Sequence, residues 1–302
     1  MYKSICKLWN YICCPNNKQK KEEDYDKYIT VNIEENNYNL YNSIIEKGKL
    51  CFPSEKCSVY IYNNNIYKVF TPSNMSRYGN IIEELYKINT NNLLTPEKIY
   101  NEPYIEKYKY YKNGDLFSYI MYNNYSNISS NSRVLYLFER IVHCIHTIHS
   151  NDIVHRDIKP DNFLITYRKN KLDVILIDFE FASKYNDDDY FSGGSYSYAA
   201  PELFKHNIID NYKCIDIWSL GVVLFILIQH EFPWNCAIVK DELFCKYLDN
   251  INNYWKNKIK SNNKLSQLFS DILTYCFKLD YTNRNDITYI IDLINDYKLK
   301  IN

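Results

Sequence analysis

Apolar residues along the chain follow two different periods. Two short runs rich in Val, Ile and Tyr, "CSVYIY" and "IYKVF", lie on either side of three asparagines at positions 63–65. This pattern predicts a tight β-hairpin. A helix is expected around residues 80–89, followed by further strands up to Tyr111. From residue 132 onward, apolar positions recur every three or four residues, as in "VLYLFERIVHCIHTIH", which predicts a mainly helical second part.

A small strand-rich unit therefore precedes a larger helical one, and the fold class is α+β. We expect an N-terminal extension over residues 1–44, a small lobe over 45–111 and a large lobe over 112–302. The longest apolar run, Ile217 to Ile228, is shorter than the roughly 20 residues that span a bilayer. It predicts a buried core helix.

The first 44 residues read as irregular, with one amphipathic stretch. Four apolar residues lie at helical spacing: Ile5, Leu8, Trp9 and Ile12. Cys13, Cys14 and a group of lysines follow them. This pattern is compatible with an interfacial helix that carries palmitate, and so with peripheral membrane contact. The alternative is a frayed extension whose cysteines are incidental.

Charge and cysteine usage narrow the class of partner and the compartment. Lys plus Arg equals Asp plus Glu at 36 each among 302 residues, so no basic field points to nucleic acid. The ten cysteines form no C-x-x-C pair and no regular framework, and the N-terminus does not resemble a signal peptide. Reduced thiols in an intracellular, cytoplasmic protein are expected.

Polar residues that suit phosphoryl transfer are concentrated in two short segments. "IVHRDIKPDNFLI" places an Asp, a Lys and an Asn on one loop between short β-type runs, and "VILIDF" delivers a further Asp at the end of an apolar strand. Asp157 can orient or deprotonate a hydroxyl, and Lys159 can neutralise a phosphoryl group. Asn162 can bind Mg²⁺ beside Asp178. A polar turn after a helix would not explain this spacing.

These motifs resemble the eukaryotic protein kinase family. "HRDIKPDN" is similar to its catalytic loop, and the Lys is of the serine/threonine type. "GGSYSYAAPE" resembles the end of an activation segment, in which Ser195 would face Asp157 and Lys159. "DIWSLG" resembles the start of the long buried helix of the large lobe. In "LDYTNRNDI", Arg284 stands where the family pairs an Arg with the Glu of A-P-E, here Glu202.

The resemblance implies a nucleotide site between the lobes. Lys68 would contact the α- and β-phosphates, with Asp178 as a Mg²⁺ ligand, and ATP with Mg²⁺ or Mn²⁺ as cofactors. Tyr108 would be the gatekeeper, and Lys109 to Tyr111 the hinge. Further nucleotide contacts are implied for these residues: Val59, Lys109, Tyr111 and Asp115.

The small lobe departs from the family pattern. The three glycines of the phosphate-covering loop should fall at Phe52, Ser54 and Cys57, and none is glycine. Side chains there would hinder close backbone approach to the phosphates. The helix partner of Lys68 should be a Glu. An ungapped comparison puts Ile81 there, and Glu84 is favoured if the loop after the helix is shortened.

Glu180 replaces the glycine of D-F-G, and it either approaches a Mg²⁺ through water or pairs with a lysine. The D-F-E triplet also resembles small-molecule kinases of the choline and aminoglycoside type. These generally lack "APE" and "DIWSLG" landmarks, so a protein substrate is favoured. The lost glycines leave a pseudokinase or scaffold as another alternative. The prediction is a monomeric serine/threonine protein kinase that uses ATP.

The activation segment carries two regulatory alternatives. Arg156 could receive a phosphate on Ser192, or the acidic run at 187–189 could substitute for that phosphate. A merely solvated charged loop is equally compatible. Asp115 and Asp161 weakly favour substrates with Arg or Lys before the phosphoacceptor.

Overall fold

The computed structural model of the chain describes most of the region beyond residue 34. The described ranges are 35–53, 57–70, 78–88, 90–101, 103–122, 131–186, 193–205, 209–251, 253–259 and 263–301. The predicted interfacial helix with Cys13 and Cys14 lies outside them.

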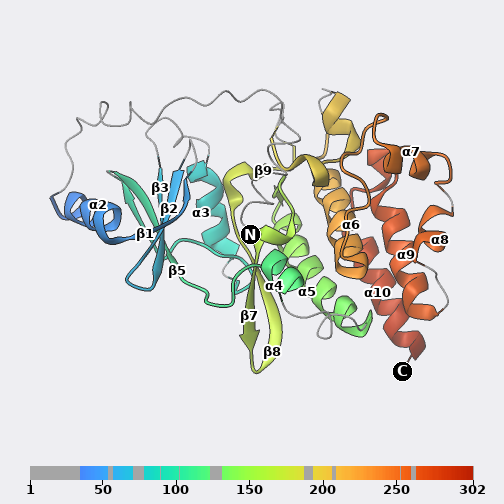
Figure 1. Cartoon of the computed structure of the whole chain (residues 1–302), viewed down its shortest axis with the longest axis horizontal. Coiled ribbons are helices and arrows are strands. Elements are labelled where there is room, and N and C mark those ends of the chain that lie inside the picture. The colour runs from blue at the N-terminus through green and yellow to red at the C-terminus, as the bar shows by residue number, and fades with distance from the viewer. Residues whose placement is uncertain are drawn as a thin grey trace.

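A five-stranded antiparallel sheet forms the small lobe (Figure 1). Its strands are β1 (Lys49–Pro53), β2 (Cys57–Tyr62), β3 (Asn65–Phe70), β4 (Lys98–Asn101) and β5 (Tyr104–Lys109), in the order β1-β2-β3-β5-β4. The predicted hairpin is confirmed as β2 and β3. Asn63 and Asn64 make its two-residue turn with φ angles of 47° and 58°, the left-handed values that such turns require and that Asn tolerates.

Helix α2 (Glu35–Lys47) covers one face of this sheet. Ile44 is fully buried against Tyr67 and Ile105, which alternate onto this face of β3 and β5. The prediction of an irregular extension was therefore wrong for residues 35–44. The helix begins before the expected lobe boundary because its apolar stripe has a sheet face to cover.

The opposite face of the sheet is turned toward helix α3 (Tyr78–Ile88) and the large lobe (Figure 1). This confirms the helix expected around residues 80–89. Ile81, Ile82 and Leu85 are buried and belong to the same apolar cluster as the large lobe. The sheet thus has a separate small core on one face and shares the main core on the other.

The large lobe is mainly helical, as predicted. Its helices are α4 (Leu116–Tyr122), α5 (Asn131–His149), α6 (Lys213–Gln229), α7 (Glu242–Leu248), α8 (Tyr254–Ile259), α9 (Lys264–Cys276) and α10 (Thr288–Ile301). Its strands are β6 (Ile153–Val154), β7 (Phe163–Arg168), β8 (Lys171–Leu176) and β9 (Ser183–Lys184), in the pairs β6-β9 and β7-β8.

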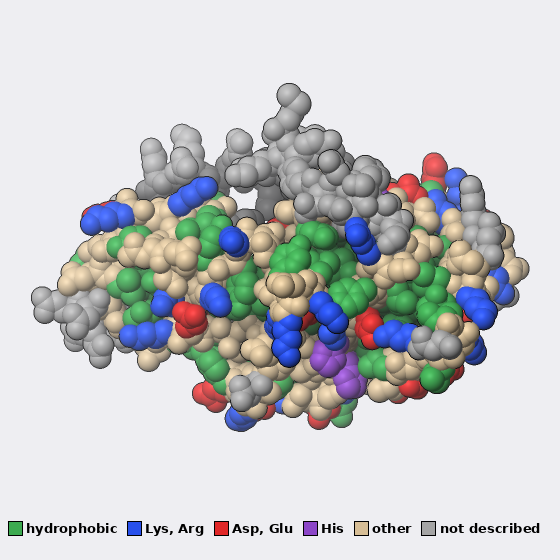
Figure 2. All heavy atoms as spheres, turned by 90° about the horizontal axis from the view of Figure 1, so that it is seen from below, with side chains coloured by type: hydrophobic (Ala, Val, Ile, Leu, Met, Phe, Trp, Pro, Cys, Tyr) green, Lys and Arg blue, Asp and Glu red, His purple; other side chains and the backbone are tan. Residues whose placement is uncertain are grey.

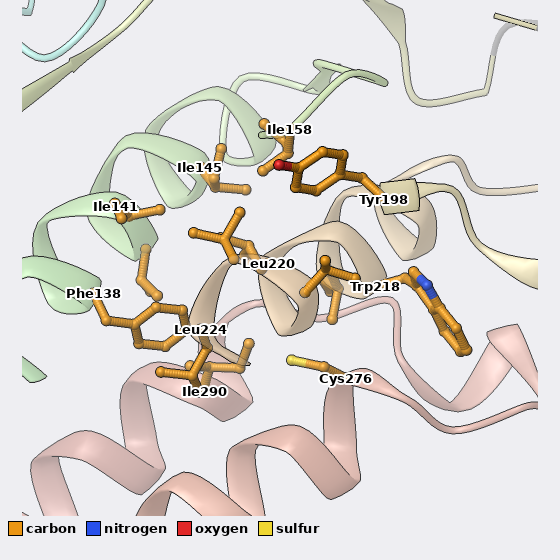
Figure 3. Packing of buried hydrophobic residues seen from close by; sticks show 14 of the residues in the cluster. Phe138, Ile141, Ile145, Ile158, Tyr198, Trp218, Leu220, Leu224, Cys276 and Ile290 are labelled. Atoms are coloured by element: carbon orange, nitrogen blue, oxygen red, sulfur yellow. The ribbon is translucent and has the colours of Figure 1, made fainter. Parts of the chain in front are cut away.

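Helix α6 lies at the centre of this lobe, and its apolar run is the predicted core helix. Leu220 and Leu224 pack against Phe138 and Ile141 of α5 on one side (Figure 3). Cys276 at the end of α9 approaches from the other side. Because α6 is apolar all round, it is buried on every face.

Charged side chains of both signs are scattered over the face shown in Figure 2, as the zero formal charge suggests. Within the described ranges, no helix combines the length and apolar character that crossing a bilayer needs.

Candidate active site

The loop after β6 is anchored by Asp216 near the start of α6. The Asp216 carboxylate accepts hydrogen bonds from the backbone N–H groups of His155 and Arg156, each at 2.8 Å, and lies 2.9 Å from the Nε2 atom of His149. Burial alone would raise the pKa of Asp216, but the His149 contact and these donors outweigh it and lower the pKa. Asp216 therefore stays ionised and fixes the backbone just before Asp157.

Asp157 is nearly buried and lies at the centre of a polar cluster. Its Oδ2 atom accepts hydrogen bonds from Lys159 Nζ at 2.5 Å and from Asn162 Nδ2 at 3.2 Å. Its Oδ1 atom accepts one from the Ser195 backbone N–H at 3.0 Å, and Lys159 Nζ also donates to Ser195 Oγ at 3.0 Å. The predicted approach of the Ser195 hydroxyl is confirmed for Lys159, whereas Asp157 is met by the Ser195 backbone N–H.

The β7–β8 hairpin brings Asn162 and Asp178 to one end. Asn162 precedes β7, Asp178 follows β8, and the Ile177 N–H donates to the Asn162 carbonyl at 2.9 Å between them. The Asn162 side-chain nitrogen donates hydrogen bonds to the backbone carbonyl of Asp157, at 2.7 Å, and to the Asp157 carboxylate. These bonds do not use the amide oxygen. An amide oxygen beside a carboxylate is a donor set that suits Mg²⁺ or Mn²⁺.

Asp178 also meets the small lobe. Its backbone is left-handed, with φ 67°, and its Oδ1 atom accepts a hydrogen bond from Lys68 Nζ on β3 at 2.6 Å. Burial raises the pKa of the Asp178 carboxyl, yet Lys68, His155 and Lys159 together bring it below its ordinary value. Residues 110 positions apart in sequence are thereby joined across the two lobes.

Lys68 has a direct cross-strand neighbour on each side. In the sheet register, Val59 on β2, Lys68 on β3 and Glu106 on β5 are directly opposite one another and share the face turned toward α3. Glu106 is not among the site residues expected from the sequence. The available signal was an acidic residue between two tyrosines in "YIEKYK", in a strand whose alternate positions face the interior.

The structure does not contain the predicted pairing of Glu84 with Lys68. Glu84 lies at the surface, where it pairs with Lys87 at 3.0 Å and with Lys184 of β9 at 3.6 Å. The reason is the orientation of α3. Its buried face carries Ile81, Ile82 and Leu85, which leaves Glu84 on the outer side.

The other residues predicted to contact the nucleotide lie on β1, at the start of β2, at the end of β5 and just beyond it. Phe52 of β1 is opposite Val59, Cys57 begins β2 and is buried, and Ser54 lies outside the described residues. Lys109 ends β5, with its ammonium 5.5 Å from the centre of the Tyr111 ring.

Asp115 lies just beyond this segment and is already engaged. Its two carboxylate oxygens accept hydrogen bonds from the N–H and hydroxyl of Ser118, at 2.6 and 3.1 Å. This fixes the start of α4.

The predicted pairing of Arg284 with Glu202 is confirmed. Arg284 is fully buried, donates through Nη2 to Glu202 Oε1, and donates through Nε to the Cys214 carbonyl at 3.3 Å. Its guanidinium carbon lies 4.9 Å from the centre of the Trp218 ring. This buried ion pair joins the segment after Ser195 to the core around α6.

The Arg156 side chain donates through Nε to the Phe181 carbonyl at 2.6 Å and lies over the Tyr212 ring at 5.5 Å. Ser192 and the acidic run at 187–189 lie outside the described residues.

A model of the protein kinase domain family matches residues 80–293, more than two thirds of the 302 residues. The chain therefore belongs to the protein kinase domain family. The match begins after β3, so Lys68 and the glycine-free loop lie outside the matched range.

Curated relatives are protein kinases by name, and several are named serine/threonine-protein kinases. The SNF-related serine/threonine-protein kinase of Rattus norvegicus is 37% identical over 140 residues, which are 44% of this chain and 18% of the relative. The serine/threonine-protein kinase SIK1 of Mus musculus is 34% identical over 126 residues, 41% of this chain and 15% of the relative. The carbon catabolite-derepressing protein kinase of Secale cereale is 31% identical over 183 residues, 58% and 32% respectively. The matched region thus spans less than a third of each of these relatives.

Proposed function

We propose that the chain is a serine/threonine protein kinase that transfers the γ-phosphoryl group of ATP to Ser or Thr of a protein. The observation that carries the proposal is the Asp157 cluster. A buried carboxylate is held by Lys159 and by the Ser195 N–H, next to the hairpin end that carries Asn162 and Asp178.

The residues divide the reaction among them. Asp157 orients the substrate hydroxyl and accepts its proton as the hydroxyl oxygen attacks the γ-phosphorus and the bond to the bridging oxygen of ADP breaks. Lys159 neutralises charge on the phosphoryl oxygens. Asn162 and Asp178 are the residues that would hold Mg²⁺ or Mn²⁺, which neutralises phosphate charge when bound. Lys68 releases its hydrogen bond to Asp178 and binds the nucleotide phosphates instead.

A protein substrate is favoured over a small molecule by the buried pair of Glu202 and Arg284. The pair fixes the segment that follows Ser195 against α6, which creates a platform beside Asp157 on which a peptide can dock. The relatives named as serine/threonine-protein kinases support the same choice.

An intracellular location is part of the proposal. The seven cysteines of the described part are free thiols, and Cys144, Cys214 and Cys276 are buried. Free thiols suit a reducing compartment.

Transfer of label from γ-³²P-ATP with Mg²⁺ or Mn²⁺ tests the proposal, on the protein itself and on a basic generic protein substrate. Asp157→Asn keeps the shape of the side chain and removes the base. We expect wild type to label serine or threonine, and the variant to lose activity by roughly 100-fold or more, the range that a positioned general base supplies. Nucleotide binding by the variant is expected to persist.

Phosphoamino-acid analysis and a choline and aminoglycoside panel distinguish the alternatives. Label on a small molecule in place of protein would contradict the choice of substrate. Nucleotide binding without any transfer by wild type would indicate a pseudokinase or scaffold.

A further inference from the structure

Glu106 is a wholly buried carboxyl that the proposed mechanism has not used. It lies in the middle of β5, directly opposite Lys68 in the β3–β5 register, with 0% of its surface exposed. Residues opposite one another in an antiparallel pair project from the same face and have Cβ atoms about 5 Å apart. A lysine and a glutamate placed in this way are within ionic reach.

The surroundings of Glu106 hold its carboxyl in place. The Tyr108 hydroxyl donates to Oε2 at 2.6 Å, and the Tyr104 hydroxyl is 3.3 Å from Oε1. These tyrosines precede and follow Glu106 by two residues, so all three side chains share one face of β5. Burial raises the pKa of Glu106 to about 7, while Tyr108, Lys68 and Tyr104 each favour its charged form.

Helix α3 does not present a carboxylate to Lys68. The described residues that it buries toward the core are Ile81, Ile82 and Leu85, and its Glu84 pairs with two surface lysines. The Lys68 ammonium lies 6.0 Å from the centre of the ring of Tyr108, the residue whose hydroxyl donates to Glu106.

We propose that Glu106 of β5 is the carboxylate that positions Lys68 toward the nucleotide phosphates, in place of an acidic residue on α3. The inference rests on the proposed use of ATP. Lys68 holds Asp178 in the structure and must release it to meet phosphates. A carboxyl fixed by two tyrosine hydroxyls on the neighbouring strand keeps the lysine in the site during that exchange. Glu106 is thus a positioning residue that acts through Lys68.

A double-mutant cycle on ATP affinity tests the coupling. Glu106→Gln keeps size and hydrogen-bonding capacity and removes the charge. We expect it to weaken binding of a fluorescent ATP analogue by about tenfold, the effect of losing one charged hydrogen-bond partner. In a Lys68→Met background the same change should weaken binding by no more than about twofold, because the partner is already gone. Equal losses in the two backgrounds would overturn the inference.

Three further variants separate this role from a structural one. Glu97→Gln removes an exposed carboxylate that pairs with Lys107 of β5 at 3.4 Å, and it should leave affinity within about twofold. Glu106→Asp keeps the charge and should recover most of the affinity that Gln loses. An Asp variant as weak as the Gln variant would contradict the role of the charge. Loss in Glu84→Gln with none in Glu106→Gln would assign the role to α3.

Two readouts keep the outcome independent of catalysis. Urea unfolding of Glu106→Gln should show a midpoint at least as high as that of wild type, since the cost of burying the Glu106 carboxylate outweighs the favourable effect of its partners. A wild-type chain that binds ATP but transfers no phosphate would refute the proposed kinase activity, while the cycle would still decide the role of Glu106.

Discussion

Two buried carboxylates near the site differ in how their charge is compensated. Asp216 receives two backbone N–H groups and a histidine ring, and its pKa is lowered although it is almost fully buried. Glu106 receives two tyrosine hydroxyls, which do not outweigh burial, and its pKa rises to about 7. The first carboxylate can serve as a permanently charged anchor. The second can change its charge near neutral pH.

This difference predicts that the titration of Glu106 makes the free energy of unfolding depend on pH. The groups that face it are Lys68, Tyr86, Tyr104, Tyr108 and Asp178. With a folded pKa of about 7 against an ordinary 4.5, the folded state holds the extra proton, and stability falls as pH rises through this interval. We expect Glu106→Gln to match wild type near pH 5. At pH 8 it should be more stable, by on the order of 3 kcal/mol at most.

Urea unfolding of both proteins at the two pH values measures this difference. The comparison cancels the other titrating groups, because they are common to both proteins. A difference in unfolding free energy that stays constant from pH 5 to 8 would show that Glu106 is ionised throughout.

At the scale of the element, α6 depends on a close approach to the end of α9. A Cβ atom added at Gly221 would lie 2.7 Å from the Cys276 Cβ and 2.9 Å from the Phe277 ring. Alanine would favour the helix by up to about 1 kcal/mol, but overpacking of a filled core costs about 1–3 kcal/mol. We expect Gly221→Ala to destabilise the chain by about 1–2 kcal/mol, measured as a lower urea midpoint with an unchanged slope. A higher midpoint would mean that Cys276 and Phe277 can shift to accommodate the added methyl group.

Elements with a strong local signal could be predicted, and those fixed by tertiary contacts could not. The asparagine turn, α5, α6 and the loop around Asp157 each follow from periodicity or spacing within a short window. Helix α2 was missed because its apolar stripe is weak until the sheet supplies a face for Ile44. The partner of Lys68 was misassigned because the outward orientation of Glu84 is decided by how α3 packs, which the α3 sequence alone leaves open.

At the scale of the whole molecule, the lobes depend on different cores. Ile44, Tyr67 and Ile105 form a small cluster between α2 and the sheet, separate from the main cluster that runs through the large lobe and α3. The Lys68–Asp178 pair joins the two lobes at the site. Strand β3, which carries Lys68, is therefore stabilised by helix α2 on the sheet face opposite the site, although α2 contributes no residue to the proposed chemistry.

Ile44→Ala tests this dependence. Ile44 is fully buried, and truncating a buried isoleucine costs about 2–5 kcal/mol. Because its cluster is separate from the main core, we expect the loss to be confined to the small lobe. In hydrogen exchange, amides of β1, β2 and β3 should lose protection, and those of α6 should not. ATP affinity should fall with them, since β3 carries Lys68. Ile45→Ala, on the same helix but 40% exposed, is the matched control and should change neither readout. Equal loss of protection in β3 and α6 would instead show that the lobes unfold as one unit, and that α2 stabilises the whole molecule.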